Sequence, residues 1–234
     1  MQIIITGASK GIGKAIASAF ARDNKHTLFL CARNISALQE TATEISAQYP
    51  ETQVHCRSCD VGDKQQLQQF ADFILSYGKP VDVLVNNAGT FLPGSVYNEP
   101  EGTLEKMLNI NLMSAYHLTR MLAPQFIRQQ SGAIFNICSI ASLTAYANGG
   151  SYSISKYALA GFTKNLREEL KPFGIKVCGV YPGAVMTDSW AGSGVDPVRI
   201  MQADDVAKMI YAATQLSPQA VIEDIVLRPQ LGDL

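Results

Sequence analysis

Short runs of apolar residues, many of them β-branched, alternate along this chain with longer segments in which apolar residues recur every three or four positions. Within the short runs, polar residues do not alternate with apolar ones, which is typical of strands buried on both faces of a parallel sheet. The longer segments have the period of amphipathic helices. This order of strands and helices predicts a doubly wound α/β domain, in which helices cover both faces of the sheet.

The same pattern sets approximate bounds for each element. Strands are predicted at residues 2–6, 27–32, 52–56, 81–86, 133–138, 175–181 and 221–227. Helices are predicted at residues 12–20, from Ile35 onward, at 67–77, from Thr103 to Gln129, from Ser151 to Leu170 and near 204–215. The stretches 141–150 and 187–198 have neither pattern, and each follows a strand. Both are therefore expected at the carboxyl edge of the sheet, where ligands bind in this architecture.

The predicted helix from Ser151 to Leu170 carries two polar groups on the face that should be buried. On a helix of about 3.6 residues per turn, one narrow stripe contains Tyr152, Lys156, Leu159, Thr163, Leu166 and Leu170. A phenol and an ammonium group thus lie at the N-terminal end of a face that is otherwise expected to be buried. The simpler interpretation is that Tyr152 and Lys156 are ordinary neighbours on a helix surface. The other motifs of the chain favour a catalytic helix.

A glycine-rich stretch, Thr6 to Gly13 (TGASKGIG), directly follows the first predicted strand and opens the first helix. Glycines allow a tight turn and a close approach of the backbone to a pyrophosphate, which the amides and the positive end of the helix then stabilise. The alternative is a tight turn of purely structural importance. The spacing GxxxGxG differs from the GxGxxG fingerprint, but the strand-loop-helix context predicts a dinucleotide site.

Composition and charge narrow the classes of partner. The chain has 234 residues, of which 47% are hydrophobic and 17% charged, and its formal net charge is -1. These values suit one domain, spanning 1–234, with a substantial core. Without a long basic run, nucleic acid and membrane surfaces are not expected as partners, so the partner should be a small molecule. The N-terminus has no signal-peptide pattern and no apolar run is long enough to span a membrane, so a cytoplasmic location is predicted.

The cysteines do not predict a disulfide framework or a metal site. They are five in number and scattered along the chain, which fits buried thiols. Cys56 and Cys59 form a CxxC next to His55. No second ligand pair accompanies it, and a redox pair favours a helix N-terminus, whereas this one lies at a strand edge. No metal is expected.

Taken together, the motifs resemble the short-chain dehydrogenase/reductase family in its compact single-domain form. They are, in chain order, TGASKGIG, the Asn86-Asn87-Ala88-Gly89 run, Asn111, Ser139, Tyr152-x-x-x-Lys156 and Pro182-Gly183. The resemblance implies a Rossmann-type fold. It also implies a cofactor site built from Gly7, Ser9, Lys10, Gly11, Ile12, Gly13, Arg33, Asp60, Val61, Asn87, Ala88, Gly89, Tyr152, Lys156, Pro182, Gly183, Val185 and Thr187.

The choice of cofactor rests on the end of the second predicted strand. In this family an acidic residue there holds the ribose hydroxyls of NAD, whereas basic residues accept the 2′-phosphate of NADP. This chain has Arg33 at that edge and Lys10 in the glycine loop. Two cations favour NADP(H), because each can form a charge-assisted bond to phosphate. The alternative is that both are solvated surface charges.

The resemblance also assigns the catalytic roles. Tyr152 is the acid that protonates the substrate oxygen, Lys156 lowers the pKa of that phenol and binds ribose, and Ser139 holds the carbonyl oxygen. Asn111 resembles the asparagine that kinks its helix and anchors a proton-relay water. Asn109 is a nearby competitor, and Asn111 is preferred only because it matches the motif.

These residues predict NADP(H)-dependent reduction of a ketone or aldehyde, reversible as alcohol oxidation. The C-terminal VIEDIVLRPQLGDL is similar to sepiapterin-reductase-like and general carbonyl reductases. A 3-oxoacyl-carrier-protein reductase is the alternative activity, and a catalytically silent NADP-sensing protein is the alternative of another class. An apolar pocket is predicted from Phe91, Leu143, Tyr146, Met186 and Trp190, although Trp190 fits plain packing equally well. The resemblance implies a homodimer or homotetramer that pairs through the helix from Thr103 and the Tyr152 helix.

Overall fold

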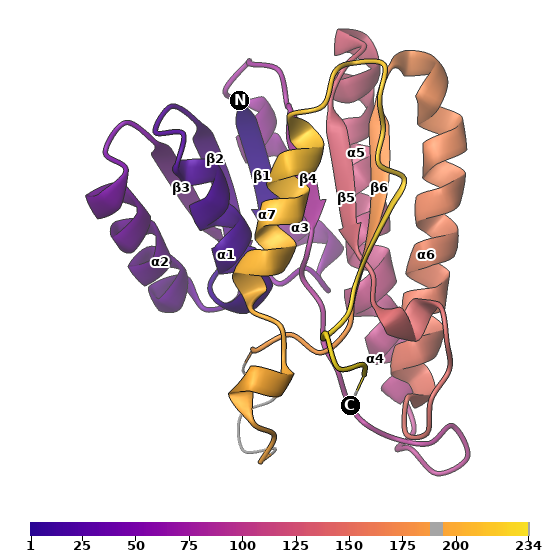
Figure 1. Ribbon diagram of the computed structural model, residues 1–234. Helices are drawn as coiled ribbons and strands as arrows, with labels where there is room; N and C mark the ends of the chain where they lie inside the picture. The colour runs from indigo at the N-terminus through magenta and orange to yellow at the C-terminus, as the bar shows by residue number, and fades with distance from the viewer. Residues whose placement is uncertain (188–193, 234) are drawn as a thin grey trace.

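The computed structural model describes residues 1–187 and 194–233, and within these ranges the strands form one parallel sheet (Figure 1). Its strands are β1 (Gln2–Thr6), β2 (Thr27–Ala32), β3 (Gln53–Ser58), β4 (Val83–Asn86), β5 (Ala133–Ile137), β6 (Lys176–Pro182) and β7 (Asp224–Leu227). Their order across the sheet is β3-β2-β1-β4-β5-β6-β7, and every neighbouring pair is parallel. The prediction of a doubly wound parallel sheet is confirmed.

Helices cover both faces of this sheet. They are α1 (Gly11–Ala21), α2 (Ile35–Gln48), α3 (Lys64–Leu75), α4 (Thr103–Leu108), α5 (Ser114–Gln129), α6 (Gly150–Leu170) and α7 (Ala203–Thr214). Apolar residues of α1, α2 and α7 pack on one face, and those of α3, α5 and α6 pack on the other. Figure 1 shows α1 and α7 side by side in front of the sheet. None of the helices in the described ranges is long and apolar enough to cross a membrane.

The strands explain why their sequences lack polar alternation. Along β1, Ile3 and Ile5 belong to the core beneath α1 and α7, whereas Ile4 belongs to the core beneath α3 and α5. All three are fully buried. Since successive strand residues point to opposite faces and both faces are covered, consecutive positions in the middle of a central strand are apolar.

The strand order reverses between β1 and β4, which lie next to each other in the middle of the sheet. The glycine loop leaves β1 at its carboxyl end, and the Asn87 turn leaves β4 at the same edge. In open α/β sheets a crevice forms at such a reversal, outside the carboxyl ends of the strands. The fold thus brings the two motifs together.

The predicted long helix from Thr103 to Gln129 is not continuous. A π-helical turn, Asn109–Met113, separates α4 from α5. In this turn the Asn111 side chain is engaged by the backbone of Thr90 and by Ser155 rather than by solvent. The helical spacing of apolar residues did not mark this break, although the resemblance implied a kink at Asn111, which lies within the turn.

Candidate active site

The glycine loop has a backbone path that excludes side chains. Gly7 has a φ of +66°, in the left-handed region. A Cβ placed at Gly13 would lie 2.5 Å from Asn87 Nδ2 and closer still to the carbonyl oxygen of Gly7. One at Gly11 would meet the Thr187 methyl group at 3.2 Å. The loop is therefore a narrow cradle of backbone amides at the start of α1, which suits a pyrophosphate group.

The turn after β4 holds this cradle in place. Asn87 Nδ2 donates to the carbonyl oxygens of Thr6 and Gly7 at 2.9 and 3.0 Å. The backbone N–H groups of Asn87 and Ala88 both donate to Thr6 Oγ1, at 3.0 and 2.9 Å. Thr6 is nearly fully buried. The Asn87 side chain thus binds the backbone of the glycine loop. Sequence reasoning missed Thr6, the residue that joins the glycine loop to the Asn87 turn.

The side of the cradle beyond β2 and β3 carries the residues expected around the adenosine part of a nucleotide. Arg33 and Lys10 are both exposed, Arg33 directly after β2 and Lys10 at the N-cap of α1. Asp60, after β3, accepts the N–H of Gly62 at 2.9 Å, and Val61 is buried. Ser9 accepts a hydrogen bond from Thr41 Oγ1 through its carbonyl, at 3.1 Å. The described residues at this edge thus offer cations to a bound phosphate.

Tyr152 lies in the first turn of α6, next to the carboxyl end of β5. Burial raises the pKa of its phenol above the ordinary value of 10.0, because it disfavours the phenolate, and a hydrogen bond with Ser139 opposes that shift. Ser139 follows β5 and caps the short turn Ile140–Ser142, with its Oγ accepting the N–H of Ala141 at 3.1 Å. The structure brings Ser139 and Tyr152 together, and the hydrogen bond from the Ala141 N–H holds the Ser139 hydroxyl in place.

Lys156 is buried one helical turn further along α6, with 5% of its surface exposed. Its Nζ donates to the carbonyl oxygen of Ile137 at 2.7 Å and lies 5.8 Å from the centroid of the Tyr152 ring. Burial lowers the pKa of this amine to about 8. The lowering of the Tyr152 pKa by Lys156 stays a prediction, because the shift of the phenol in the structure comes from burial and is opposed by the hydrogen bond with Ser139.

The two candidate asparagines occupy different surroundings. Asn111 has 1% of its surface exposed, accepts the N–H of Thr90 at 2.7 Å and donates to Ser155 Oγ at 2.9 Å. Ser155 Oγ in turn donates to the carbonyl oxygen of Tyr152 at 2.7 Å. Asn109 is exposed and donates to the carbonyl oxygen of Gly62 at 3.0 Å. Asn111 is therefore the asparagine that contacts the catalytic helix.

Gly89, in the turn after β4, lies close to both Asn111 and Lys156. A Cβ at Gly89 would lie 3.3 Å from Asn111 Oδ1 and 3.6 Å from Lys156 Nζ. The NNAG turn, the π-helical turn and α6 therefore converge at one point. Sequence reasoning missed Ser155 and Thr90 here, because each is defined by a partner far along the chain: Asn111 and Ser155 are separated by 44 positions.

The end of β6 forms the remaining wall. The N–H of Gly183, which follows Pro182, donates to the carbonyl oxygen of Leu227 at 2.8 Å. Val185 pairs with Met201 in an isolated parallel bridge. Thr187 packs over Gly11, so this segment returns to the glycine loop, where Ile12 packs at the edge of the core.

Among the residues predicted to form an apolar substrate pocket, Phe91 contacts Tyr152. The Phe91 ring meets the Tyr152 ring edge to face, with 4.9 Å between centroids and an interplanar angle of 82°. Phe91, Leu143 and Tyr146 are 41%, 42% and 48% exposed, and Met186 is half-buried. The predicted contribution of Trp190 lies outside the described residues.

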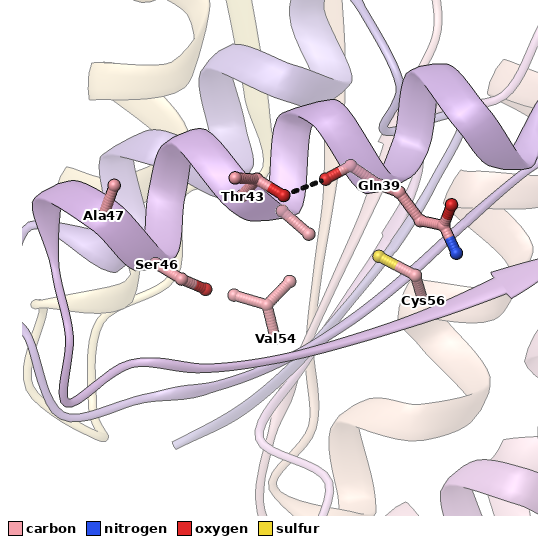
Figure 2. A pocket seen from close by; sticks show the side chains of 7 residues that line it. Gln39, Thr43, Ser46, Ala47, Val54 and Cys56 are labelled. Carbon is pink, nitrogen blue, oxygen red and sulfur yellow. Dashed lines mark hydrogen bonds between the residues drawn. The ribbon is translucent and has the colours of Figure 1, made fainter.

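The CxxC motif of Cys56 and Cys59 and the neighbouring His55 are not part of this site. His55 packs against Phe29, Phe73 and Tyr77, and the five cysteines are free thiols. Figure 2 shows an open groove between α2 and the edge strand β3, lined by Gln39, Ala42, Thr43, Ser46, Ala47, Val54 and Cys56. Burial raises the pKa of the Cys56 thiol in this groove to about 11, so the thiol is protonated and unreactive at neutral pH. The groove shares no residue with the site around Tyr152.

Comparisons with known proteins match this geometry. The family model described as short chain dehydrogenase matches residues 1–196. The chain is 32% identical over 240 residues to sepiapterin reductase from Chlorobaculum tepidum, covering 99% of this chain and 97% of that protein.

Two solved structures extend the comparison. A metagenomic short-chain oxidoreductase in complex with NADP is similar with a TM-score of 0.86 and 29% identity, over 98% of this chain and 97% of that one. A 7α-hydroxysteroid dehydrogenase complexed with NADH and 7-oxo glycochenodeoxycholic acid has a TM-score of 0.87 and 29% identity, over 99% and 94% of the two chains. Similar structures thus include one solved with NADP and one with NADH.

Proposed function

The chain belongs to the short-chain dehydrogenase family, and from that membership we propose that it is an NADP(H)-dependent reductase of ketone or aldehyde carbonyls, reversible as an alcohol dehydrogenase. One observation carries the proposal: Ser139, Tyr152 and Lys156 lie together beside a backbone cradle that only glycine permits. A protein that only sensed a nucleotide would have no chemical need for all three side chains.

The cradle fits a dinucleotide. Gly7, Gly11 and Gly13 leave backbone amides at the N-terminus of α1, where a pyrophosphate is stabilised. Arg33, after β2, and Lys10, at the start of α1, would bind a 2′-phosphate, which would favour NADP(H) over NAD(H). Lys156 and Thr187 would hold the nicotinamide half. When bound, the cofactor supplies or accepts the hydride.

The remaining chemistry belongs to the chain itself. With a pKa above the ordinary value of 10.0, the phenol of Tyr152 is protonated at neutral pH and would be the group that donates a proton to a carbonyl oxygen. Ser139 holds that oxygen and also stabilises the phenolate left after proton transfer. Asn111 anchors the α6 backbone at Tyr152 through Ser155, which keeps the donor in place.

The apolar surroundings favour a hydrophobic or aromatic carbonyl substrate. The Phe91 ring packs against the Tyr152 ring, and we assign the exposed side chains of Leu143 and Tyr146 to the same pocket. We therefore favour a sepiapterin-like or general carbonyl substrate over an acyl-carrier thioester. The similarity to sepiapterin reductase along nearly the whole chain supports this choice.

NADPH consumption by the purified protein tests the proposal, using a panel of pterins, aromatic diketones, quinones and acetoacetyl thioesters. We expect turnover with NADPH to exceed that with NADH. Tyr152→Phe should lower kcat by about 10²–10⁴-fold while NADPH binding is retained, because only the proton donor is lost. Tyr157→Phe is the matched control, since that tyrosine is exposed on the same helix. Full activity of Tyr152→Phe would refute the mechanism, and the best substrate decides between the carbonyl and acyl activities.

We extend the proposal to a homodimer or homotetramer. The α6 helix exposes Ile154 and Tyr157, at 41% and 44%, on the surface away from the sheet. Sedimentation velocity measures the assembly directly. Replacing both residues with glutamate should shift the protein toward monomer, and an unchanged sedimentation coefficient would argue against pairing through α6.

A further inference from the structure

The catalytic helix α6 begins without a cap of its own. Its N-cap residue is Gly149, which has no side chain to accept the free N–H groups, and the first turn contains no acidic residue. The first turn of a helix leaves four backbone N–H groups without intrahelical acceptors, and the helix dipole favours a negative charge there. Tyr152 lies in this turn, so whatever stabilises the turn also positions the phenol.

A carboxylate from a distant loop supplies the cap. Glu99 Oε2 accepts the N–H of Ser151 at 3.3 Å, and Glu99 Oε1 accepts the hydroxyl of the same serine. Ser151 is fully buried. One side chain thus satisfies a backbone and a side-chain donor in the residue immediately before Tyr152, across 52 positions of sequence.

The backbone around this contact is shaped to admit the carboxylate. Gly150 has a φ of +36°, and a Cβ there would lie 2.8 Å from Glu99 Oε2 and closer still to the carbonyl oxygen of Gly94. The N–H of Gly94 donates to the carbonyl oxygen of Asn148 at 3.2 Å, and Ser95 Oγ donates to Asn148 Oδ1 at 3.0 Å. The contacts of Gly94 and Ser95 with Asn148, together with that of Glu99 with Ser151, therefore join this loop to the start of α6 and the segment before it.

The same loop touches the site at its other end. The backbone of Thr90 exchanges two hydrogen bonds with the Asn111 side chain, and the neighbouring Phe91 ring lies against Tyr152. The loop from Thr90 to Glu99 is thus anchored to Asn111 at its start and to α6 at its end. Phe91, which makes the aromatic contact with the phenol, lies between these anchors in the sequence.

We propose that Glu99 is a positioning residue for the reaction: its carboxylate caps α6 and thereby fixes the Tyr152 phenol against Ser139. The kinetic part of this inference rests on the proposed function. Glu99 contacts neither the glycine loop nor the Asn87 turn, so its loss should change proton transfer and leave cofactor binding intact.

The test compares Glu99→Ala and Glu99→Gln with Glu101→Gln, which changes the charge of an exposed residue two positions further along the chain. We expect Glu99→Ala to lower kcat about tenfold, because small displacements of a catalytic group are costly, with the NADPH dissociation constant within about twofold of wild type. Glu99→Gln keeps one acceptor oxygen and should recover part of the loss. Glu101→Gln should match wild type.

Hydrogen exchange of the segment 149–155 provides a readout independent of turnover. Glu99→Ala should lose about tenfold or more of the protection of this segment, while the rest of α6 is unchanged. If Glu99→Ala does not fold, Ser151→Ala, which removes the hydroxyl donor, replaces it. Unchanged protection overturns the inference, and so does lost protection with unchanged kcat. If the wild type reduces no carbonyl, the proposed function fails, and the exchange comparison still decides whether Glu99 caps α6.

Discussion

The two halves of the site are built in different ways. The cofactor half is made of backbone: Gly7 and Gly13 approach so closely that a single added carbon would collide, and Asn87 uses its side chain only to hold that backbone. The proposed substrate half is made of side chains, with Phe91, Leu143 and Tyr146 each about half exposed. The positions of Gly7 and Gly13 accept only glycine, whereas the exposed positions of the second half can accept several kinds of side chain.

That difference separates the part of the site that recognises a group common to all nicotinamide dinucleotides from the part that selects among substrates. A backbone cradle recognises a phosphate group that every nicotinamide dinucleotide shares. Exposed aromatic and aliphatic groups recognise shape and apolar area, which differ between substrates. Substitutions in the first half should therefore remove all activity, and substitutions in the second should redistribute activity among carbonyls.

The largest expected effect comes from closing the cradle. Gly13→Ala places a Cβ against the Gly7 carbonyl and Asn87 Nδ2, which should lower the free energy of unfolding by about 3 kcal/mol or more. NADPH affinity should fall at least about 100-fold, because the loop must move. Calorimetry and NADPH fluorescence titration measure both quantities.

Gly161→Ala is the matched control for this change. No atom lies within 4 Å of the added carbon, and the residue is inside α6. The control should stabilise the protein by about 0.5–1 kcal/mol, since alanine is the better helix former. Normal NADPH affinity in Gly13→Ala would show that the cradle is not as rigid as its contacts imply.

The next effect concerns Lys156, where the two halves meet. The amine has a pKa of about 8 in the folded protein against an ordinary value of 10.5, so its charged form is penalised by about 3 kcal/mol at pH 7. Between pH 8 and 10.5 the unfolded chain binds a proton that the folded chain does not, so this penalty disappears as pH rises.

Lys156→Met should therefore stabilise the cofactor-free protein at pH 7 by about 2 kcal/mol, after the lost hydrogen bond to Ile137 is subtracted. The advantage over wild type should shrink toward pH 10.5, and turnover should be lost. Urea denaturation of both proteins at pH 7 and pH 10 measures the difference. A methionine variant that is less stable at pH 7 would mean that the burial of Lys156 is already compensated.

The contrast also explains which features could be predicted from sequence. The parallel sheet follows from unbroken apolar strands, and the cradle follows from glycines directly after β1, because both are local demands on the chain. Asn111 could be told from Asn109 only by motif, since its burial depends on Thr90 and Ser155. The Glu99 contact with Ser151 leaves no local signal, because each residue is ordinary in its own segment.

The effect of Lys156 on the pKa of Tyr152 could not be judged from sequence for a related reason. A spacing of four residues places Lys156 near Tyr152, but sequence does not report how much water reaches either group. In the structure Lys156 is buried and Tyr152 is partly buried, and desolvation is the largest cause of the pKa shift of each group. The apolar spacing did not mark the π-helical turn at Asn109–Met113, and only the resemblance implied a kink at Asn111.

A smaller effect is expected at the rim of the cofactor half. Arg33→Ala removes one cation next to the predicted 2′-phosphate site, so the NADPH dissociation constant should rise about 10–100-fold. The NADH constant should stay within about threefold. Arg128→Ala, an exposed arginine in the last turn of α5, is the control. Equal weakening of both cofactors would assign Arg33 a general electrostatic role and remove the basis for NADP preference.

The smallest effect should come from the substrate half, and it should depend on the substrate. Phe91→Ala removes an edge-to-face contact with Tyr152, a pair worth about 0.5–1.5 kcal/mol beyond its buried area. For a bulky aromatic ketone, kcat/KM should fall up to about tenfold, mainly through KM, because apolar contact is lost in the ground and transition states alike. For a small aliphatic aldehyde that does not reach the ring, kcat/KM should change less than twofold. Phe91→Leu keeps apolar area without the ring, so its values separate shape from aromaticity. An equal loss for both substrates would mean that Phe91 acts through the placement of Tyr152, and the substrate half would then be as strictly determined as the cradle.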